Sequence, residues 1–412
     1  MRKKLAVVLS LGLLASAISA TAANPPKPGA NCTKAGLTQN YNGMKYTCTK
    51  SGKKMIWDYG KPVTPEPNIE IDPRISPNQA LSDISRCQTT DLTQGPGMNN
   101  GFPRPSWTVA GKVVANVLVV PVALVDRPYS QKDIATITKV YSDTADFYKE
   151  QSYGFFTMKY KVLPPERGIY LSQTAKEAGA DGRIDEPFLT EYLTKILGSW
   201  EPSVNLNEYD VVVLSSNAGG NAEVKVQPYQ TRKGTINSLV LEFGGFPDLF
   251  LNAHELGHAL FGFEDLYLQT PQLNQNWLPA GVWDIMSDDI SGRNFMGWNR
   301  FLAGWLPSSQ IRCLTDQTST VHYLSNIDRY GGYKLLILNL SPGVSIAVDS
   351  RTSVSELQMA CIEKIDTNIG HGQGPVRLLG LIREKSSLDV EGWNFTLLAS
   401  DKKGLLLQVK RN

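Results

Sequence analysis

The sequence predicts a mixed α/β fold that is followed by a β-rich C-terminal region. Between residues 107 and 310, apolar runs suited to buried strands alternate with segments whose apolar residues recur at helical spacing. One of these segments, around residue 255, is too apolar for a helix that faces solvent. From residue 311 onward only short strand and turn signals occur. Strands that alternate with helices are typical of a sheet covered by helices.

The elements of the α/β region follow one another as strand, helix, strand, helix, strand, strand and helix. Val113–Val125 is a nearly continuous apolar run, as expected of a strand that is buried on both faces. The other expected elements are Lys132–Gln151 (helix), Phe156–Val162 (strand), Pro187–Leu197 (helix), Tyr209–Leu214 (strand) and Thr235–Leu241 (strand). We expect a twisted sheet over two long helices. The strand at Thr235–Leu241 is expected to be the edge strand, which an extended peptide could join.

The last helix of this region carries the most informative motif of the chain. It is expected to begin after Asp248 as N-cap and to end at Gly262. Within it, residues 254–258 read His-Glu-Leu-Gly-His, in a chain that has only four histidines. Histidines four residues apart lie on one face of a helix, so His254 and His258 can bind one metal ion together. Glu255 lies at the rim of that face, where its carboxylate can take a proton from a metal-bound water.

The N-terminus predicts export. Residues 1–23 contain a basic start, an apolar run from Leu5 to about Leu14, and small residues up to Ala23, as in a cleaved signal peptide. The apolar run is too short to span a bilayer comfortably, and we find no later run of about 18 apolar residues. We therefore expect a secreted, extracellular protein and a monomer. The formal net charge of +2 argues against a dedicated nucleic-acid binder.

The composition predicts five segments. After the signal peptide (1–23), residues 24–62 form a small cysteine-containing module with seven lysines and a single acid, Asp58. Weak contact with an anionic cell envelope and a merely solvated spacer are both open interpretations of this module. Residues 63–106 are rich in Pro, Asn and Ser and are expected to be a linker or pro-segment. Residues 107–310 are the predicted catalytic domain, and residues 311–412 the β-rich domain.

Five cysteines leave one without a partner if the others form disulfides, which export permits. By position, we expect Cys32 to pair with Cys48 and Cys313 with Cys361, which leaves Cys87 over. A free Cys87 thiolate could occupy the open metal position and keep the enzyme latent. The alternatives are a disulfide between Cys87 and one of the other two, or a buried thiol.

A catalytic zinc ion needs a third protein ligand beyond the two histidines. One class of zinc enzymes uses a glutamate from a second helix some twenty residues on, but no glutamate occurs between Glu264 and Glu356. Another class turns at a glycine and returns a ligand three residues later, which Gly262 and Asp265 could provide. Further on, residues 283–287 read Trp-Asp-Ile-Met-Ser, and Met286 matches a methionine turn of the kind found beneath zinc.

These motifs together resemble the immune inhibitor A-like family of secreted metallopeptidases. The resemblance covers roughly residues 105–370, and its most specific stretches are residues 253–260, Asp265-Leu266-Tyr267, residues 282–286 and residues 297–306. It implies a zinc endopeptidase of zincin, metzincin-like architecture, with a twisted sheet and an active-site helix. The implied zinc ligands are His254, His258 and Asp265, the implied general base is Glu255, and structural calcium is also implied.

The chain departs from the metzincin pattern at one position. The pattern places glycine three residues after the second histidine, where this chain has Phe261, and Gly262 comes one residue later. Counted from His258, the third ligand would be Glu264, whereas counted from the glycine it would be Asp265. We favour Asp265, because the glycine can take a positive φ at low energy and so sets the register of the turn.

Two functions are compatible with these residues. The first is hydrolysis of peptide bonds in protein substrates outside the cell. The second is a binding protein at the cell envelope that keeps a zincin fold but is catalytically silent. Glu255 favours the enzyme, because this carboxylate has no evident part in holding the fold.

Overall fold

The computed structural model describes residues 26–41, 44–62, 72, 74–77, 81–93, 97–177, 197, 200, 204–217, 222–226, 228–242, 248–272, 275–292, 294–314, 319–352 and 358–412. The expected signal peptide (1–23), nearly all of the helix expected at Pro187–Leu197 and much of the expected linker lie outside these residues. The chain divides into two units, residues 1–61 and 62–412. Among the described helices, none has the length and apolar character needed to cross a membrane.

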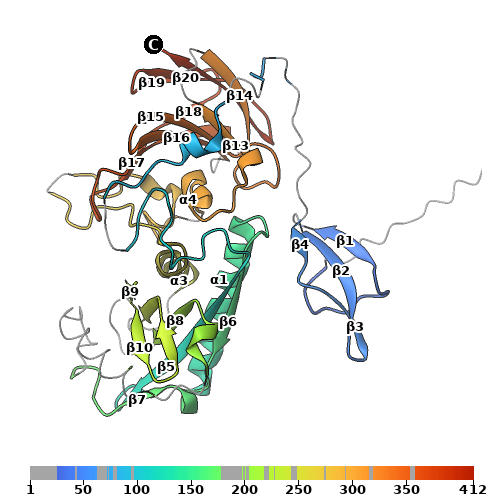
Figure 1. The fold of residues 1–412 in the computed structure, drawn as a ribbon, viewed down its shortest axis with the longest axis vertical. Helices are drawn as coiled ribbons and strands as arrows, with labels where there is room; N and C mark the ends of the chain where they lie inside the picture. Colours follow the sequence, from blue (N-terminus) through green and yellow to red (C-terminus); the bar gives the residue numbers. More distant parts are fainter. Residues whose placement is uncertain are drawn as a thin grey trace, which may run out of the picture. The chain divides into compact units, whose positions relative to one another are not determined.

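The first unit contains a small antiparallel sheet (Figure 1). Strands β1 (Thr38–Tyr41), β2 (Met44–Ser51) and β3 (Lys54–Trp57) follow one another in the sheet, and β4 (Lys61–Pro62) also pairs with β2. A disulfide joins Cys32 to Cys48, as expected. Such a bond suits a module of this size, whose hydrophobic cluster among the described residues is small and contains the buried side chains Met44, Tyr46, Cys48 and Trp57.

The second unit begins with the expected α/β layer. Its six-stranded sheet has the order β6–β5–β8–β12–β9, with β7 paired to the far end of β5. The strands are β5 (Val114–Leu124), β6 (Thr157–Val162), β7 (Ile169–Leu171), β8 (Val211–Ser215), β9 (Ala222–Lys225) and β12 (Leu239–Glu242). The strands of this sheet are parallel to their neighbours except β9, which is antiparallel to β12. The near-continuous apolar run at residues 113–125 is therefore a central strand with both faces covered.

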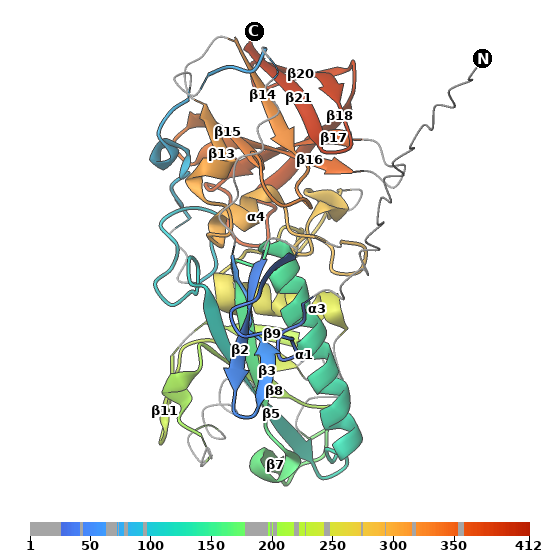
Figure 2. The same cartoon turned by 90° about the vertical axis from the view of Figure 1, so that its right-hand side faces the viewer.

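Two helices pack against each other on this sheet (Figure 2). Helix α1 (Gln131–Gln151) begins at a capping box formed by Ser130 and Asp133. Helix α3 (Leu249–Leu256) begins at Asp248, whose side chain accepts hydrogen bonds from two backbone N–H groups of the first turn. The hydroxyl of Tyr148 on α1 donates to the carbonyl of Ala253 on α3 over 2.6 Å. A third helix, α4 (Gly297–Leu302), leads into the C-terminal part, and short 3₁₀ turns occur at Ile84–Cys87, Pro165–Arg167, Leu206–Glu208, Gly281–Trp283 and Ser308–Gln310.

The strand expected at Thr235–Leu241 is wrong in two respects. The chain bends at Asn237 and Ser238, so the segment divides into β11 (Gly234–Ile236), which forms a hairpin with β10 (Tyr229–Thr231), and β12. Asn and Ser favour such bends because their side chains compete for backbone hydrogen bonds. Strand β12 is also not the edge strand. It lies between β8 and β9, and β9 forms the edge within the described residues.

The region from residue 311 is β-rich, as expected, and consists of two sheets. The five-stranded sheet has the order β13–β15–β16–β17–β18, and the four-stranded sheet has the order β14–β21–β20–β19. The strands are β13 (Ile311–Leu314), β14 (Ser319–Ser325), β15 (Leu335–Ser341), β16 (Val344–Thr352), β17 (Gln358–Asp366), β18 (Val376–Arg383), β19 (Ser387–Val390), β20 (Trp393–Ser400) and β21 (Gly404–Arg411).

The inner strands β15, β16 and β17 of the five-stranded sheet are largely buried on both faces, and the sheet contributes to two cores. On β15, Leu335 and Ile337 face the core of the α/β layer, whereas Leu336 and Leu338 face the core between the two C-terminal sheets. Because side chains alternate along a strand, two buried faces require an unbroken apolar run, which explains the sequence Leu-Leu-Ile-Leu. The α/β layer and the β-rich region therefore share one continuous core.

The described parts of residues 72–106 belong to the larger unit and pack against its other elements. Arg104 reaches the helical turn that follows α3, where its guanidinium donates to the carbonyls of Phe261 (2.6 Å) and Gly262 (2.9 Å). These bonds satisfy carbonyl groups that a helix leaves without internal partners at its C-terminus.

Two of the cysteine assignments are wrong. Cys87 forms a disulfide with Cys313, and Cys361 is the free, buried cysteine. The expected Cys313–Cys361 pair does not form because the segment before the α/β layer, with Cys87 in a 3₁₀ turn, lies against β13. The disulfide also removes the proposed latency switch, because a bonded Cys87 has no thiolate to offer a metal.

We predict that thiol mapping will recover this pattern. Peptides from the freshly secreted protein, digested without reductant, should contain Cys87 linked to Cys313 and Cys32 linked to Cys48. Cys361 is fully buried, and burial raises the pKa of its thiol well above the usual range, so it should react with maleimide only after unfolding. Rapid labelling of Cys361 in the folded protein, or a Cys361-containing disulfide, would contradict this assignment.

Candidate metal centre

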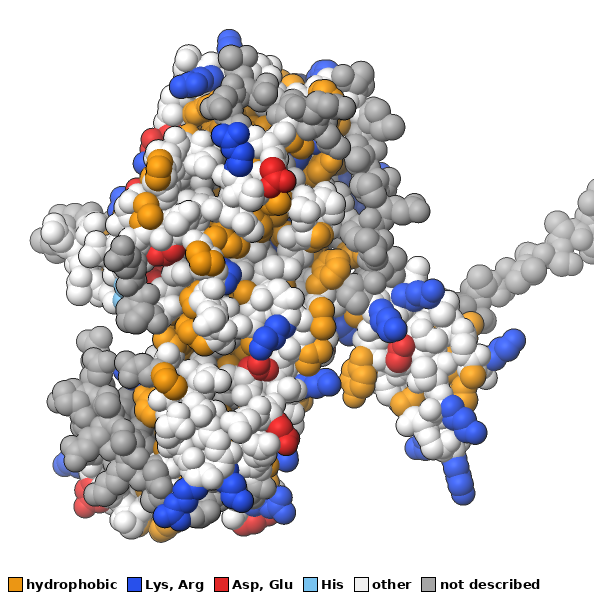
Figure 3. Space-filling model, in the orientation of Figure 1, with side chains coloured by type: hydrophobic (Ala, Val, Ile, Leu, Met, Phe, Trp, Pro, Cys, Tyr) orange, Lys and Arg blue, Asp and Glu red, His pale blue; other side chains and the backbone are white. Residues whose placement is uncertain are grey.

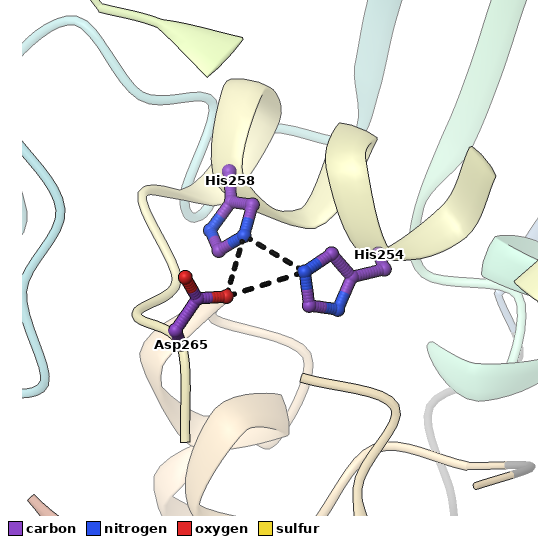
Figure 4. A group of neighbouring side chains, drawn as sticks. All are labelled: His254, His258 and Asp265. Atoms are coloured by element: carbon purple, nitrogen blue, oxygen red, sulfur yellow. Dashed lines mark hydrogen bonds and ion pairs between the residues drawn. The ribbon is translucent and has the colours of Figure 1, made fainter. Parts of the chain in front are cut away.

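Three buried side chains, from α3 and from the turn that follows it, converge on one point (Figure 4). The Nε2 atoms of His254 and His258 lie 3.0 Å apart. Oδ1 of Asp265 lies 3.2 Å from the first and 3.1 Å from the second. Each of the three residues is at most 6% exposed. The structure thus brings together all three residues that the sequence predicts as metal ligands.

The hydrogen bonds of the two imidazoles direct lone pairs into this triangle. Nδ1 of His254 lies 2.9 Å from the carbonyl oxygen of Ile285, and Nδ1 of His258 lies 2.6 Å from that of Phe263. A carbonyl can only accept, so each Nδ1 carries the proton. In a neutral imidazole the other nitrogen, Nε2, is then an acceptor, and it is the atom that a metal would bind.

Three acceptor atoms that face one another require a cation. Oδ1 of Asp265 is buried and has no hydrogen-bond donor. Leaving such an atom unpaired costs free energy, unless a proton or a metal ion lies between the acceptors. Ligands bound tetrahedrally at about 2.0–2.1 Å from one zinc ion are separated by roughly 3.3 Å, close to the observed distances. Two imidazoles and a carboxylate also match the donor set of catalytic zinc sites, so the residues fit this metal.

The turn after the helix explains why Asp265, and not Glu264, enters the triangle. Residues Gly257–Phe261 form a π-helical turn, and Gly262 follows in the left-handed conformation, with φ of 65°. A π-helical turn accommodates one more residue than an α-helical turn. The additional residue, Phe261, is absorbed in this way and its ring packs on Phe156, Phe263 and Trp305. The register after the glycine is therefore preserved, and Glu264 points instead to His371.

The segment with Met286 lies directly beneath the helix. Met286 is fully buried, and its sulfur lies so close to Gly257 that a Cβ at that position would be 2.9 Å from it. The backbone carbonyl of Met286 accepts from Leu266 N at 2.9 Å, one residue after Asp265. The preceding residue, Ile285, supplies the carbonyl that orients His254. One turn therefore positions both a histidine and the segment that carries the carboxylate.

Glu255 lies outside the triangle. It is 8% exposed, and burial raises the pKa of its carboxyl group, although the charges of the neighbouring histidines oppose this shift. Within the described part of the chain, its carboxylate makes no hydrogen bond. A buried carboxylate with a raised pKa beside a metal site is suited to accept a proton.

The metal-free triangle binds a proton tightly. Burial alone would lower the pKa of His254, but the Asp265 carboxylate, which would accept a hydrogen bond from a protonated Nε2, and the charge of Glu255 raise this pKa to about 9. Burial would raise the pKa of Asp265, and the two histidines hold it far below its usual range instead. A metal ion that binds here must displace this proton.

Sequence reasoning missed three residues at the rim of the site. Gln269 and His371 form hydrogen bonds next to Asp265, and the ring of Tyr267 stacks on that of His254 with centroids 6.3 Å apart. Tyr267 could have been found, because it follows Asp265 by two residues in a motif already singled out. His371 gives no such signal. It lies 106 residues beyond Asp265, in the loop between β17 and β18, and only the shared core brings it here.

Comparisons with known proteins give one similar structure. No family model matches the chain, and neither does any curated protein sequence. The crystal structure of metalloproteinase-II from Bacteroides fragilis is similar over 65% of this chain and 77% of that chain, with 12% sequence identity and a TM-score of 0.28. The assignment of function therefore depends on the geometry of the site.

We predict that Asp265→Ala will lose bound zinc, whereas Glu264→Ala will keep it. Removing Asp265 takes away one of three ligands, while Glu264 contributes no atom to the triangle. Zinc per protein, measured by atomic emission after gel filtration, checks this expectation. Loss of metal in Glu264→Ala together with retention in Asp265→Ala would show that the third ligand is misassigned.

We further predict that zinc binding releases about one proton at neutral pH. Because the pKa of His254 in the metal-free protein is raised to about 9, this histidine is protonated at pH 7 and must lose its proton to bind metal. Apparent zinc affinity should therefore rise with pH and level off above about 9. Calorimetric titration in buffers of different ionisation enthalpy measures the proton count, and a count of zero at pH 7 would refute the assignment.

Proposed function

We propose that this protein is a secreted zinc-dependent endopeptidase. The observation that carries the proposal is the triangle of Nε2, Nε2 and Oδ1 atoms next to a buried glutamate, Glu255, that is not part of it. Three ligands leave one position of a tetrahedral site open, as catalytic zinc sites require. The motifs that resemble immune inhibitor A-like metallopeptidases support the same function, and we propose that family relationship as well.

The residues of the site have two roles: three of them would bind the metal, and Glu255 would transfer the proton. His254, His258 and Asp265 would hold zinc, which when bound supplies a Lewis acid that polarises a carbonyl and lowers the pKa of water. Glu255 accepts the proton of the attacking water and then passes it to the amine that leaves. Its raised pKa suits both steps, since the group must take up and release the proton in one cycle.

The sheet offers a place for the substrate. Strand β9 contacts α3 and the π-helical turn, and it has no second neighbouring strand among the described residues. An extended peptide could pair with this edge by main-chain hydrogen bonds and so pass the metal centre. This replaces the role expected for the strand before the helix, which lies inside the sheet.

The disulfides support an extracellular location. Two cysteine pairs are bonded, and disulfides persist in oxidising compartments. The signal sequence expected at residues 1–23 agrees with this location. All seven lysines of residues 24–62 are exposed, and Figure 3 shows blue side chains spread over this module, so we also propose weak contact with an anionic envelope polymer.

The competing function is a zincin-fold binding protein without activity. It requires no proton acceptor beside the metal, so Glu255 is unexplained by it. Incubating the secreted protein with unfolded casein, with and without a zinc chelator, distinguishes the two. Cleavage that the chelator abolishes and zinc restores supports the enzyme, whereas intact casein with zinc bound supports the binding protein.

We predict that Glu255→Gln will keep the fold and the zinc but lose activity. The glutamine preserves the size of the side chain and cannot accept a proton, so casein turnover should fall by ~10²–10⁴. Zinc content and the thermal unfolding midpoint serve as controls, and both should match the parent. A variant that cleaves casein at the parent rate would disprove the role of Glu255.

A further inference from the structure

We propose that Gln269 and His371 form a positioning chain that orients Asp265 for metal binding from the β-rich domain. The proposal rests on the proposed function, because it assigns Asp265 as a ligand. Gln269 and His371 touch neither metal nor substrate in this scheme. They act through the carboxylate.

The carboxylate of Asp265 uses its two oxygens differently (Figure 4). Oδ1 faces the two histidines, and Oδ2 points away from them. Oδ2 accepts a hydrogen bond from Nε2 of Gln269 over 3.1 Å. A carboxylate is free to rotate about its Cβ–Cγ bond, so a donor on the outer oxygen fixes which oxygen faces the metal site.

The chain continues to the loop between β17 and β18. Nε2 of Gln269 also lies 2.9 Å from Nε2 of His371. An amide nitrogen carries two hydrogens, so one is directed to Asp265 and the other to His371, whose Nε2 then accepts. The remaining proton of this imidazole is on Nδ1, which is hydrogen-bonded to Oε1 of Glu264. Glu264 is thereby the outer end of the same chain.

Backbone contacts hold this loop against the site. Gln269 N donates to the carbonyl of Gly372 over 3.0 Å, and Leu268 forms an isolated antiparallel bridge with Gln373. Gly372 and Gly374 both have positive φ and lie against the segment after Asp265, where a Cβ would come within 2.6 Å of Gln269 and 2.7 Å of Pro279. The loop therefore places His371 by main-chain geometry rather than by its half-exposed side chain alone.

This arrangement gives the β-rich domain a part in the metal centre. Three successive hydrogen bonds link Asp265 Oδ2 to Gln269, Gln269 to His371, and His371 to Glu264. Glu264, which is not a ligand, is the outermost member of this chain, so its removal is expected to weaken zinc binding without abolishing it. Partners of this kind typically change metal affinity by about 10–100-fold when they are removed.

The test measures zinc affinity in the full-length protein at one fixed pH, by competition with a chromophoric chelator. The variants are Gln269→Ala, His371→Ala and the double variant, and Gln373→Ala in the same loop is the matched control. The zinc Kd should rise about 10-fold in each single variant of the chain, Gln269→Ala and His371→Ala. This value is the lower end of the range of about 10–100-fold for residues that orient a metal ligand, because both side chains are partly exposed. The double variant should be no weaker than Gln269→Ala, because the two residues act in series. Gln373→Ala should match the parent, as should the thermal midpoint of every metal-free variant.

Two results would overturn the chain: single variants that bind zinc as tightly as the parent, or a double variant whose loss equals the product of the single losses. Casein hydrolysis is measured separately. If the parent protein binds zinc but cleaves no casein, the proposed function is refuted. The zinc affinities of the variants still test the positioning chain in that case. A parent that binds no zinc refutes the metal centre itself, and the positioning chain with it.

Discussion

The site depends on one constraint, namely that three electron-pair acceptors are held about as close as their radii allow. Neither histidine can turn away, because the Nδ1 atom of each is bound to a backbone carbonyl. Those carbonyls belong to Ile285 and Phe263, one in the segment beneath the helix and one in the turn that ends it. Main-chain hydrogen bonds on both sides thus hold the three acceptor atoms in an unfavourable arrangement. A bound cation removes the mutual repulsion of these atoms.

The main chain beneath the helix is itself held by a buried ionic network from the β-rich region. Asp349 and Arg351 on β16 form an ion pair of 2.8 Å, and Arg351 donates to the carbonyl of Trp283 over 2.7 Å. Asp349 accepts from Gly297 N, where α4 begins. Beside them, Asp284 accepts from the backbone N–H groups of Met286 and Met296. Removing one partner of such a buried pair leaves the other charge buried without compensation. A single substitution in this network should therefore lower the free energy of unfolding by more than the intact pair contributes to it.

Much of this protein is predictable from local sequence, and the failures have physical causes. The helix limits at Asp248 and Gly262 follow from capping and from positive φ, which are properties of single residues. The register that favours Asp265 follows from the same glycine. The cysteine pairing failed because a pairing across 226 residues depends on the packing of distant segments. The prediction of the edge strand was wrong for a similar reason. Strand β9 precedes β12 in the chain, yet it pairs antiparallel with the outer side of β12 and so takes the edge position. His371 depends on tertiary contact altogether, and it was not found.

The two apolar faces of the five-stranded sheet have a consequence for how this protein can have evolved. A domain with one polar surface can be joined to new partners by recombination, because its free form stays soluble. Here, Leu335 and Ile337 on one face and Leu336 and Leu338 on the other each need a different covering layer. Separating the α/β layer from the β-rich region would leave an apolar face bare on both halves, which favours aggregation. We therefore expect the two parts to be inherited together, with substitutions at their shared face compensated on the opposite side.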